Sequence, residues 1–238
     1  MKIRPCCCLV VILLHLLECT HSHLKIPIAQ KNGNDEKCLK NHPITPCRTL
    51  KYVLQYILES NETSVDISFI GNYRYLISPA LQIHTEKDRI LNLRIMSYHV
   101  AGISLTCSGD ARRIFDVYGS SLTLEFHNIT FAHCGQGNKD VIPVITANDT
   151  KKISYYSCIF QDNQCGAFFA INTDIHIEYS IFQRNSIKRI YNSHIFQSYD
   201  VSAFSGGLGI LFLNERRSMS VHVFQTRFTE NRVYIDDS

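Results

Sequence analysis

Two carboxylates placed close together could act as general acid and general base on a glycosidic bond, so acidic residues in turns are the first chemistry to consider. Asp174 follows Asn172 and Thr173 between two strand-like runs, and the acidic pair 236–237 stands 62 residues further on. Inverting hydrolysis needs carboxyl groups about 6.5–9.5 Å apart, and the sequence places no second acid there. Because Asn-Thr-Asp is also ordinary turn sequence, we expect a turn and keep Asp174 as the only catalytic candidate.

Histidines could ligate a metal, but their spacing does not predict a shared site. His176 and His222 are 46 residues apart, at the same place in two copies of a repeated pattern. Two repeats of stacked strands would separate them by about 10 Å, too far for one ion. His127 and His133 do not have the H-E-x-x-H spacing of zinc proteases. Basic pairs such as Lys151-Lys152 are interpreted as solvated turns, and we expect no metal and no cofactor.

The cysteines indicate an oxidising compartment. Six of them follow residue 22, and an even number in a chain with a secretory signal favours disulfides over thiols. None forms a C-x-x-C pair, which counts against a zinc knuckle and a thioredoxin-type site. The sequence leaves many connectivities open, and our prediction pairs neighbours: Cys38–Cys47, Cys107–Cys134 and Cys158–Cys165.

Residues 1–22 are interpreted as a secretory signal peptide. Lys2 and Arg4 precede an apolar run that ends at Leu17 and is too short to span a bilayer as a helix. Thr20 and Ser22 supply small residues near a cleavage point. We therefore expect a secreted, extracellular protein without a membrane segment after cleavage. Three sequons are predicted to carry glycans: Asn61, Asn128 and Asn148.

The charge balance excludes some partners. The formal net charge is +3, and without residues 1–22 the chain has 22 basic and 20 acidic residues. Proteins that bind nucleic acid or anionic membranes usually have a strong basic excess, so we expect neither partner. The remaining chain of about 215 residues is long enough to bury the core of one domain.

A repeated sequence pattern, which we call the cassette, indicates the secondary-structure elements that would hold the candidate acidic, histidine and cysteine side chains. The pattern Φ-x-Φ-x-x-x-x-Phe-x-x-Asn, in which Φ is apolar, begins at Ile153, Ile175 and Val221. A weaker copy begins at Leu124 and has Cys134 in the asparagine position. The successive steps from Leu124 are 29, 22 and 46 residues, and we interpret the last as two repeats of 23. A period in this range is typical of repeat architectures.

Short alternating runs bounded by Gly, Asn, Asp or Ser predict strands throughout 61–238. An immunoglobulin-type sandwich would not repeat a side-chain cassette, and a leucine-rich repeat would show leucines at fixed offsets. The sequence therefore predicts an all-β fold, a parallel β-helix solenoid whose circuits stack about 4.8 Å apart. Equivalent side chains would lie above one another. They would form an aromatic column of Phe131, Phe160, Phe182 and Phe228, and a ladder of Asn163, Asn185 and Asn231.

One helix is predicted at 49–59, where Thr49 is a suitable N-cap and five apolar residues form one stripe. This helix is expected to cover the N-terminal end of the solenoid. The predicted organisation is a signal peptide at 1–22, a flexible lead-in at 23–37, a disulfide loop and capping helix at 38–60, and the β-helix at 61–238. Only seven residues follow Asn231, so we interpret the sequence as a fragment, or an unusually short member, of a longer family.

Four sequence features point to a known group: Cys47-Arg48-Thr49-Leu50, the L-x-L-x-F-x-N-I-T-F-x-x-C run from Leu122 to Cys134, the glycine-rich segment 206–210, and the F-x-x-N cassettes. Over roughly 38–238 the chain resembles right-handed parallel β-helix proteins of the pectin-lyase-like class. More narrowly, it is similar to secreted chains related to polymorphic outer-membrane-protein repeats. The resemblance implies a right-handed solenoid, but that class holds lyases, hydrolases, adhesins and inert surface proteins.

Within the same class, Asn172-Thr173-Asp174 resembles the N-T-D motif of polygalacturonases. That family also carries a D-D pair about one repeat later, then G-H-G and R-I-K, and the last two motifs are missing here. We therefore expect a secreted non-enzymatic module for extracellular adhesion, binding or structure, with a glycan or a surface protein as partner. The alternative is a polysaccharide lyase or glycoside hydrolase, with Asp174 as the only acid to nominate.

Overall fold

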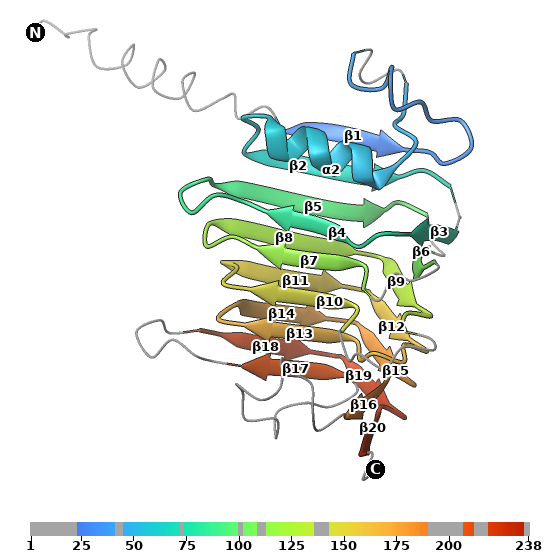
Figure 1. Cartoon of the computed structure of the whole chain (residues 1–238), viewed down its shortest axis with the longest axis vertical. Coiled ribbons are helices and arrows are strands. Elements are labelled where there is room, and N and C mark those ends of the chain that lie inside the picture. Colours follow the sequence, from blue (N-terminus) through green and yellow to red (C-terminus); the bar gives the residue numbers. More distant parts are fainter. Residues whose placement is uncertain are drawn as a thin grey trace, which may run out of the picture.

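The structure, a computed structural model, describes residues 23–40, 45–71, 74–99, 102–108, 113–135, 143–189, 207–211 and 219–235. Short parallel strands dominate this part of the chain, together with one helix (Figure 1). The signal peptide predicted at 1–22 lies outside the described residues.

Three parallel sheets contain nearly all of the strands. Sheet A has the order β1 (Leu24–Ile28), β2 (Ser64–Phe69), β5 (Leu91–Ser97), β8 (Leu122–His127), β11 (Lys152–Tyr156), β14 (Asp174–Glu178) and β18 (Val221–Phe224). Sheet B has the order β3 (Arg74–Ile77), β6 (Ile103–Cys107), β9 (Ile129–Ala132), β12 (Ile159–Gln161), β15 (Ile181–Gln183) and β19 (Arg227–Thr229). Sheet C has the order β4 (Leu81–His84), β7 (Phe115–Tyr118), β10 (Ile145–Asn148), β13 (Phe168–Ile171) and β17 (Leu208–Leu211). A small fourth sheet pairs β16 (Ser186–Arg189) with β20 (Arg232–Ile235).

The chain visits sheets A, B and C in turn and then returns to sheet A one strand further along. We call each such passage a circuit; β8, β9 and β10 form one, and β11, β12 and β13 form the next. Each strand pairs in parallel with its equivalent in the next circuit. The predicted all-β fold of stacked parallel strands is thus confirmed, and the arrangement is compatible with a β-helix-like fold (Figure 1).

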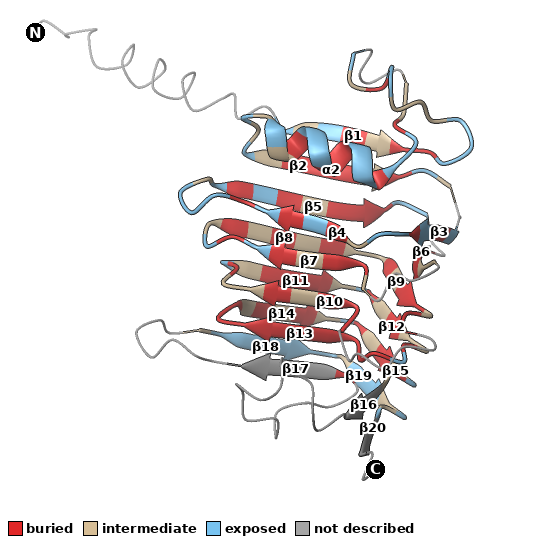
Figure 2. Cartoon of the chain, viewed as in Figure 1, coloured by how far each residue is buried: buried red, intermediate tan, exposed pale blue. Residues whose placement is uncertain are grey.

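The core lies between the sheets because alternate side chains of each strand face inward. In β8, Leu122, Leu124 and Phe126 are fully buried, while the residues between them are half-buried. The register places Leu124 beside Ile153 and Phe126 beside Tyr155, so inward residues contact their equivalents in the neighbouring circuit. Figure 2 shows this alternation as bands along the middle strands, whereas β18 is exposed.

From β8 onward, many corners between sheets bend at a non-glycine residue with positive φ, a conformation that is uncommon outside glycine. Asn128, Ser157, Tyr179 and Gln225 bend the corner from sheet A to sheet B. His133 and Asp162 bend the corner from sheet B to sheet C, and Asp149 and Asn172 the corner from sheet C back to sheet A. Arg184 and Glu230 bend the corner from sheet B into the small fourth sheet.

The residue after each bend turns inward and joins one circuit to the next. Ser180 Oγ accepts a hydrogen bond from the backbone N–H of Cys158 at 3.1 Å. At another corner, Thr173 Oγ1 accepts one from the N–H of Thr150 at 3.2 Å. Side chains therefore satisfy backbone donors that would otherwise be buried without partners.

Helix α2 (Leu50–Glu59) lies at the N-terminal end of the stack and contacts β4 (Figure 1). Its N-cap is Thr49, whose side chain accepts a hydrogen bond from the N–H of Tyr52, as the sequence predicts. Leu50, Val53, Leu54 and Ile57 are buried. At the C-terminal end the guanidinium of Arg89 donates to the carbonyls of residues 57, 58 and 60, which satisfies carbonyls that a helix end leaves without partners.

The flexible lead-in predicted at 23–37 is wrong for its first part, because Leu24–Ile28 forms β1. This strand pairs with β2, and Ile26 and Ile28 are fully buried. Pro27 is tolerated because β1 is the edge strand of sheet A, where a missing backbone donor breaks fewer ladder bonds.

Candidate functional site

The third cassette directly follows the second in the stack. Strand β14 pairs with β18, and β15 pairs with β19. The 46-residue step is therefore one circuit with a long insertion between sheets B and C and a shorter one between sheets C and A, and its interpretation as two repeats is wrong. An insertion at a corner leaves the register of the flanking strands unchanged, so the length of the step could not reveal it.

The predicted phenylalanines stack as one column. The ring centroids of Phe131 and Phe160 are 4.6 Å apart, those of Phe160 and Phe182 4.6 Å, and those of Phe182 and Phe228 4.8 Å. The first three rings are fully buried, but Phe228 is 43% exposed because it stands at the end of the column.

The predicted asparagines form a continuous hydrogen-bonded ladder. Asn163 Nδ2 donates to Asn185 Oδ1 at 2.8 Å, and Asn185 Nδ2 donates to Asn231 Oδ1 at 3.0 Å. The ladder also accepts backbone donors: Asn231 Oδ1 accepts the N–H of Asn185 at 3.0 Å. Cys134, at the asparagine position of the weak cassette, donates its N–H to Asn163 Oδ1 at 3.1 Å.

Two of the three predicted disulfides are formed, Cys38–Cys47 and Cys107–Cys134. The third is not, because Cys158 and Cys165 are present as buried thiols. They stand on opposite sides of β12, and three strand residues alone span about 10 Å, more than the Cα separation of a disulfide allows. Cys158 occupies the inward corner position of Ser180, and its thiol donates to the carbonyl of Phe126 at 3.4 Å. Burial raises the pKa of both thiols to about 12.

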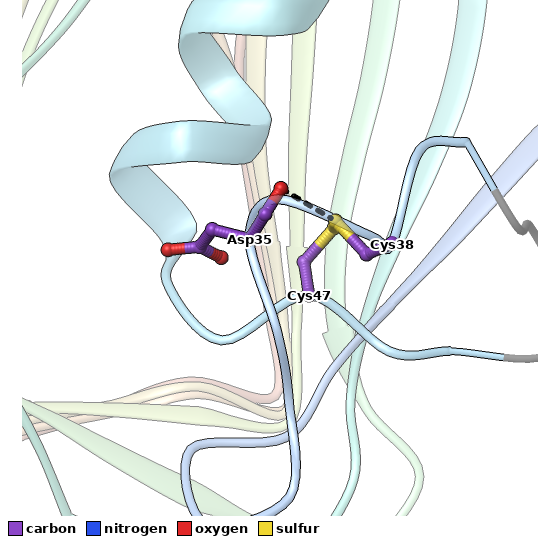
Figure 3. Close-up of side chains that lie close together, drawn as sticks. All are labelled: Asp35, Cys38 and Cys47. Atoms are coloured by element: carbon purple, nitrogen blue, oxygen red, sulfur yellow. Dashed lines mark hydrogen bonds between the residues drawn. A yellow bond between two sulfur atoms is a disulfide. The ribbon is translucent and has the colours of Figure 1, made fainter.

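Asp35, Cys38 and Cys47 lie together, but their chemistry does not suit a metal (Figure 3). Both sulfurs belong to the disulfide, so neither is a thiolate ligand. The Asp35 carboxylate is directed to the start of α2, where it accepts the N–H of Arg48 at 2.7 Å and that of Thr49 at 2.9 Å. A carboxylate there stabilises the helix N-terminus.

The Asn172-Thr173-Asp174 segment forms the corner between β13 and β14. Asn172 Nδ2 donates to Asp149 Oδ1 at 2.8 Å, and Thr173 Oγ1 donates to the carbonyl of Ile171 at 2.8 Å. Asp174 Oδ1 accepts the N–H of Ser220 at 2.9 Å. These contacts are those of a turn that joins circuits. The acidic pair 236–237 lies outside the described residues.

The three sequons differ in their surroundings. Asn61 is exposed, and Asn128 and Asn148 are half-buried. Asn128 bends a corner, and its Nδ2 donates to the carbonyl of His99 at 2.6 Å. A glycan on this nitrogen would displace that hydrogen bond, so Asn61 is the sterically open position.

The strongest candidate site is the outward face of sheet A. Polar and aromatic side chains there follow one another from strand to strand, and we call them the polar row: His23, Asp66, Arg94, Glu125, His127, Tyr156, His176, Glu178 and His222. The register aligns Asp66 with Arg94, Arg94 with Glu125, and His176 with His222, with Ser154 between Glu125 and His176.

Charged side chains contact one another at the N-terminal end of the polar row. His23 Nε2 lies 2.6 Å from Asp66 Oδ2, and Asp66 is 5% exposed. Arg94 bridges two carboxylates, with Nη1 3.6 Å from Asp66 Oδ1 and Nε 3.1 Å from Glu125 Oε2. His127 Nε2 lies 3.3 Å from the same oxygen of Glu125. Two carboxylates therefore share one guanidinium.

Rings continue the row toward its C-terminal end. His127 stacks on Tyr156 with centroids 4.6 Å apart, and Tyr156 lies 5.4 Å from His176. His176 stacks on His222 at 4.6 Å, and its Nε2 lies 2.7 Å from Glu178 Oε1. The predicted separation of His176 and His222 by two circuits is wrong, because their strands are neighbours.

A cavity of about 250 Å³ opens at the charged end of the row, lined by His23, Asp66, Asn92, Arg94, Thr123 and Glu125 among others. Larger hollows of about 580 and 630 Å³ flank α2, away from this cluster of charges. The 630 Å³ hollow is also lined by charged residues. We place the candidate site at the smaller cavity because the charged side chains there contact one another across neighbouring strands.

The ionisation of Glu125 limits what this site could catalyse. Its hydrogen bonds with His127 and Arg94 outweigh burial and lower the pKa of Glu125 to about 2. A general acid at neutral pH needs a raised pKa instead. Glu125 is thus suited to accepting hydrogen bonds from a ligand, and poorly suited to protonating a leaving group.

Comparisons with protein-family models, curated proteins and solved structures found no match. Within the part of the chain that the structure describes, α2 is far too short to cross a bilayer, and no helix qualifies as a membrane span.

Sequence reasoning missed the polar row, although a signal was present. Asp66, Arg94, Glu125, His176 and His222 each occupy the middle of an apolar-x-apolar triplet. Aligning those middle residues would have placed them on one outward face. The cassette is defined only by its apolar, Phe and Asn positions, whose side chains face the interior. It therefore contains no information about the residues that face outward.

Proposed function

We propose that the chain is a secreted right-handed parallel β-helix of the pectin-lyase-like class, and that it is a non-enzymatic binding module. Support for the solenoid comes from the repeated passage through three parallel sheets and from the corner ladders that join successive circuits. Two disulfides and the absence of a membrane-spanning helix among the described residues fit an extracellular location.

The ligand that we propose is a neutral, hydroxyl-rich glycan bound along the polar row. The observation that supports this proposal is the succession of hydrogen-bond donors, acceptors and aromatic rings across neighbouring strands, with a cavity at one end. Sugar hydroxyls both donate and accept hydrogen bonds, so they suit a surface that alternates guanidinium and carboxylate groups. Arg94 already contacts Asp66 and Glu125, which leaves the cavity without excess positive charge and disfavours an acidic sugar.

The test is a glycan array probed with the chain expressed through a secretory pathway, followed by titration of the best ligand. Arg94→Gln should weaken binding about tenfold or more, since a charge-assisted hydrogen bond contributes about 1.5–3 kcal/mol. The matched control is Asp116→Asn. Asp116 lies on β7 of sheet C, half-buried and 3.1 Å from Arg113 Nη1, but away from the polar row.

Equal affinities for the Arg94 variant and the unmodified chain would reject the polar row as the binding site. Release of reducing ends from a polysaccharide, lost in Asp174→Asn, would reject the non-enzymatic proposal and favour the hydrolase alternative. An intracellular, fully reduced native protein would reject secretion.

A further inference from the structure

We propose that His176, Glu178 and His222 bind one divalent transition-metal ion, such as Zn²⁺. The three residues stand at the C-terminal end of the polar row: His176 and Glu178 lie two strands beyond Glu125, and His222 lies three strands beyond it. This inference does not rest on glycan binding, because it concerns a different ligand, held by three residues at the end of the row away from the cavity.

The strand geometry brings three ligand atoms together. His176 and Glu178 are two residues apart on β14 and therefore share one face of the sheet. His222 is directly opposite His176 on β18. Glu178 Oε1 lies 2.7 Å from His176 Nε2 and 3.9 Å from His222 Nε2, and all three ligand atoms lie within 4.8 Å of one another.

These separations suit a small ion. Zinc binds imidazole nitrogen and carboxylate oxygen at about 2.0–2.2 Å in a tetrahedron, so its ligand atoms lie about 3.3–3.5 Å from one another. The 2.7 Å contact is a hydrogen bond between His176 and Glu178, and the rings of His176 and His222 are stacked. A bound ion would therefore replace that hydrogen bond and require the surface side chain of His222 to rotate out of the stack. His222 is 56% exposed, which leaves it free to make that adjustment.

The ligand types select among metals. Two imidazoles and a single carboxylate suit zinc, copper, nickel or iron(II), whereas calcium and magnesium prefer an all-oxygen shell. Three protein ligands also leave a fourth position for water or for a group of a bound partner. The site would thus be of the open kind, at the surface of sheet A.

Other groups of ligand-type side chains in the described part of the chain are less suited to binding a metal ion. Its second cluster of ligand-type side chains is Asp35, Cys38 and Cys47, whose sulfurs form a disulfide. Cys158 and Cys165 are buried and do not offer thiolates at neutral pH, since burial raises their pKa to about 12.

The experiment is calorimetric titration of the chelator-treated chain with ZnCl₂, together with the visible spectrum of its Co²⁺ form. We expect one ion per chain. His176→Ala, His222→Ala and Glu178→Gln should each weaken zinc binding by at least about tenfold, since the loss of even an outer partner of a metal ligand costs that much. The Co²⁺ absorption of the bound ion should disappear in the two histidine variants.

The matched control is His84→Ala. His84 is an outward histidine on β4 whose Nε2 lies 3.7 Å from Asp116 Oδ2, and its removal should leave zinc binding unchanged. Circular dichroism establishes that each variant folds, which we expect of His222→Ala because its side chain is largely exposed. Failure to take up zinc, or equal uptake by His176→Ala, His222→Ala and the unmodified chain, would overturn the proposal.

Discussion

Replacing Asn185 with alanine removes the middle member of the asparagine ladder. The side chain is fully buried. Its Nδ2 donates to the carbonyl of Phe160 at 2.9 Å and to Asn231 Oδ1 at 3.0 Å. Its Oδ1 accepts from Asn163 Nδ2 at 2.8 Å and from the N–H of Asn163 at 3.4 Å. One truncation therefore affects contacts with both neighbouring circuits.

The expected loss follows from the groups that alanine leaves behind. The carbonyl of Phe160 and the side-chain and backbone donors of Asn163 lose these hydrogen bonds, while Asn231 Oδ1 keeps the N–H of residue 185. Each buried polar group without a partner costs about 1–3 kcal/mol. If water reaches part of the space, the free energy of unfolding falls by about 3–5 kcal/mol. For a chain of this size that corresponds to a decrease in Tm of about 10 °C.

Urea unfolding followed by far-ultraviolet circular dichroism measures the change. The matched control is Gln183→Ala, which removes a half-buried amide whose Nε2 donates to Gln161 Oε1 at 3.0 Å. We expect that control to change the free energy of unfolding by no more than about 0.5 kcal/mol. Losses of similar size in the two variants would refute the reasoning that burial makes the hydrogen bonds of the asparagine ladder more costly to lose than that of the half-buried glutamine.

Three further outcomes are expected. Cys158 and Cys165 should resist iodoacetamide in the native protein at pH 8 and react after denaturation, since burial raises their pKa to about 12. Rapid labelling of these two residues in the native protein, detected by mass spectrometry of their peptides, would contradict this prediction. The folded-state pKa of Glu125, about 2, lies below its ordinary value of 4.5, so its contribution is present above about pH 4.5 and is lost as pH falls toward 2. Glu125→Gln should therefore flatten the dependence of Tm on pH in that window, and an unchanged acid limb in thermal melts would count against the shift. Replacing Cys107 and Cys134 together with serine should lower the free energy of unfolding by about 3.5 kcal/mol, because the unfolded chain regains the conformational entropy that the disulfide removes. Chemical denaturation under non-reducing conditions measures this change, and a much smaller decrease would contradict the prediction.

The interior side chains were predictable because equivalent residue types recur at nearly constant spacing along the sequence. Asn163, Asn185 and Asn231 were found from the spacing of a buried amide relative to an apolar pair, and burial makes that spacing strict. Helix α2 was predictable for a similar reason, since a cap and one apolar stripe define it locally.

The failures have physical causes in particular residues. Residue counting between Ile175 and Val221 could not distinguish two circuits from one circuit with an insertion, because only strand pairing reports the difference. Pairing Cys158 with Cys165 assumed that sequence neighbours meet, whereas Cys158 fills an inward corner position that serine occupies in the next circuit. The polar row varies in residue type from strand to strand, so no repeated letter marked it.

The asparagine ladder also has a direction. At each step the Nδ2 of one asparagine donates to the Oδ1 of the next, so the amide groups of Asn163, Asn185 and Asn231 point the same way. Aligned amides polarise one another, and their dipoles add, as those of peptide groups do along an α-helix. Partial negative charge accumulates toward Asn163 and partial positive charge toward Asn231. The ladder is therefore electrically polar along the stacking direction, and its N–H end lies at Asn231 in the last described circuit.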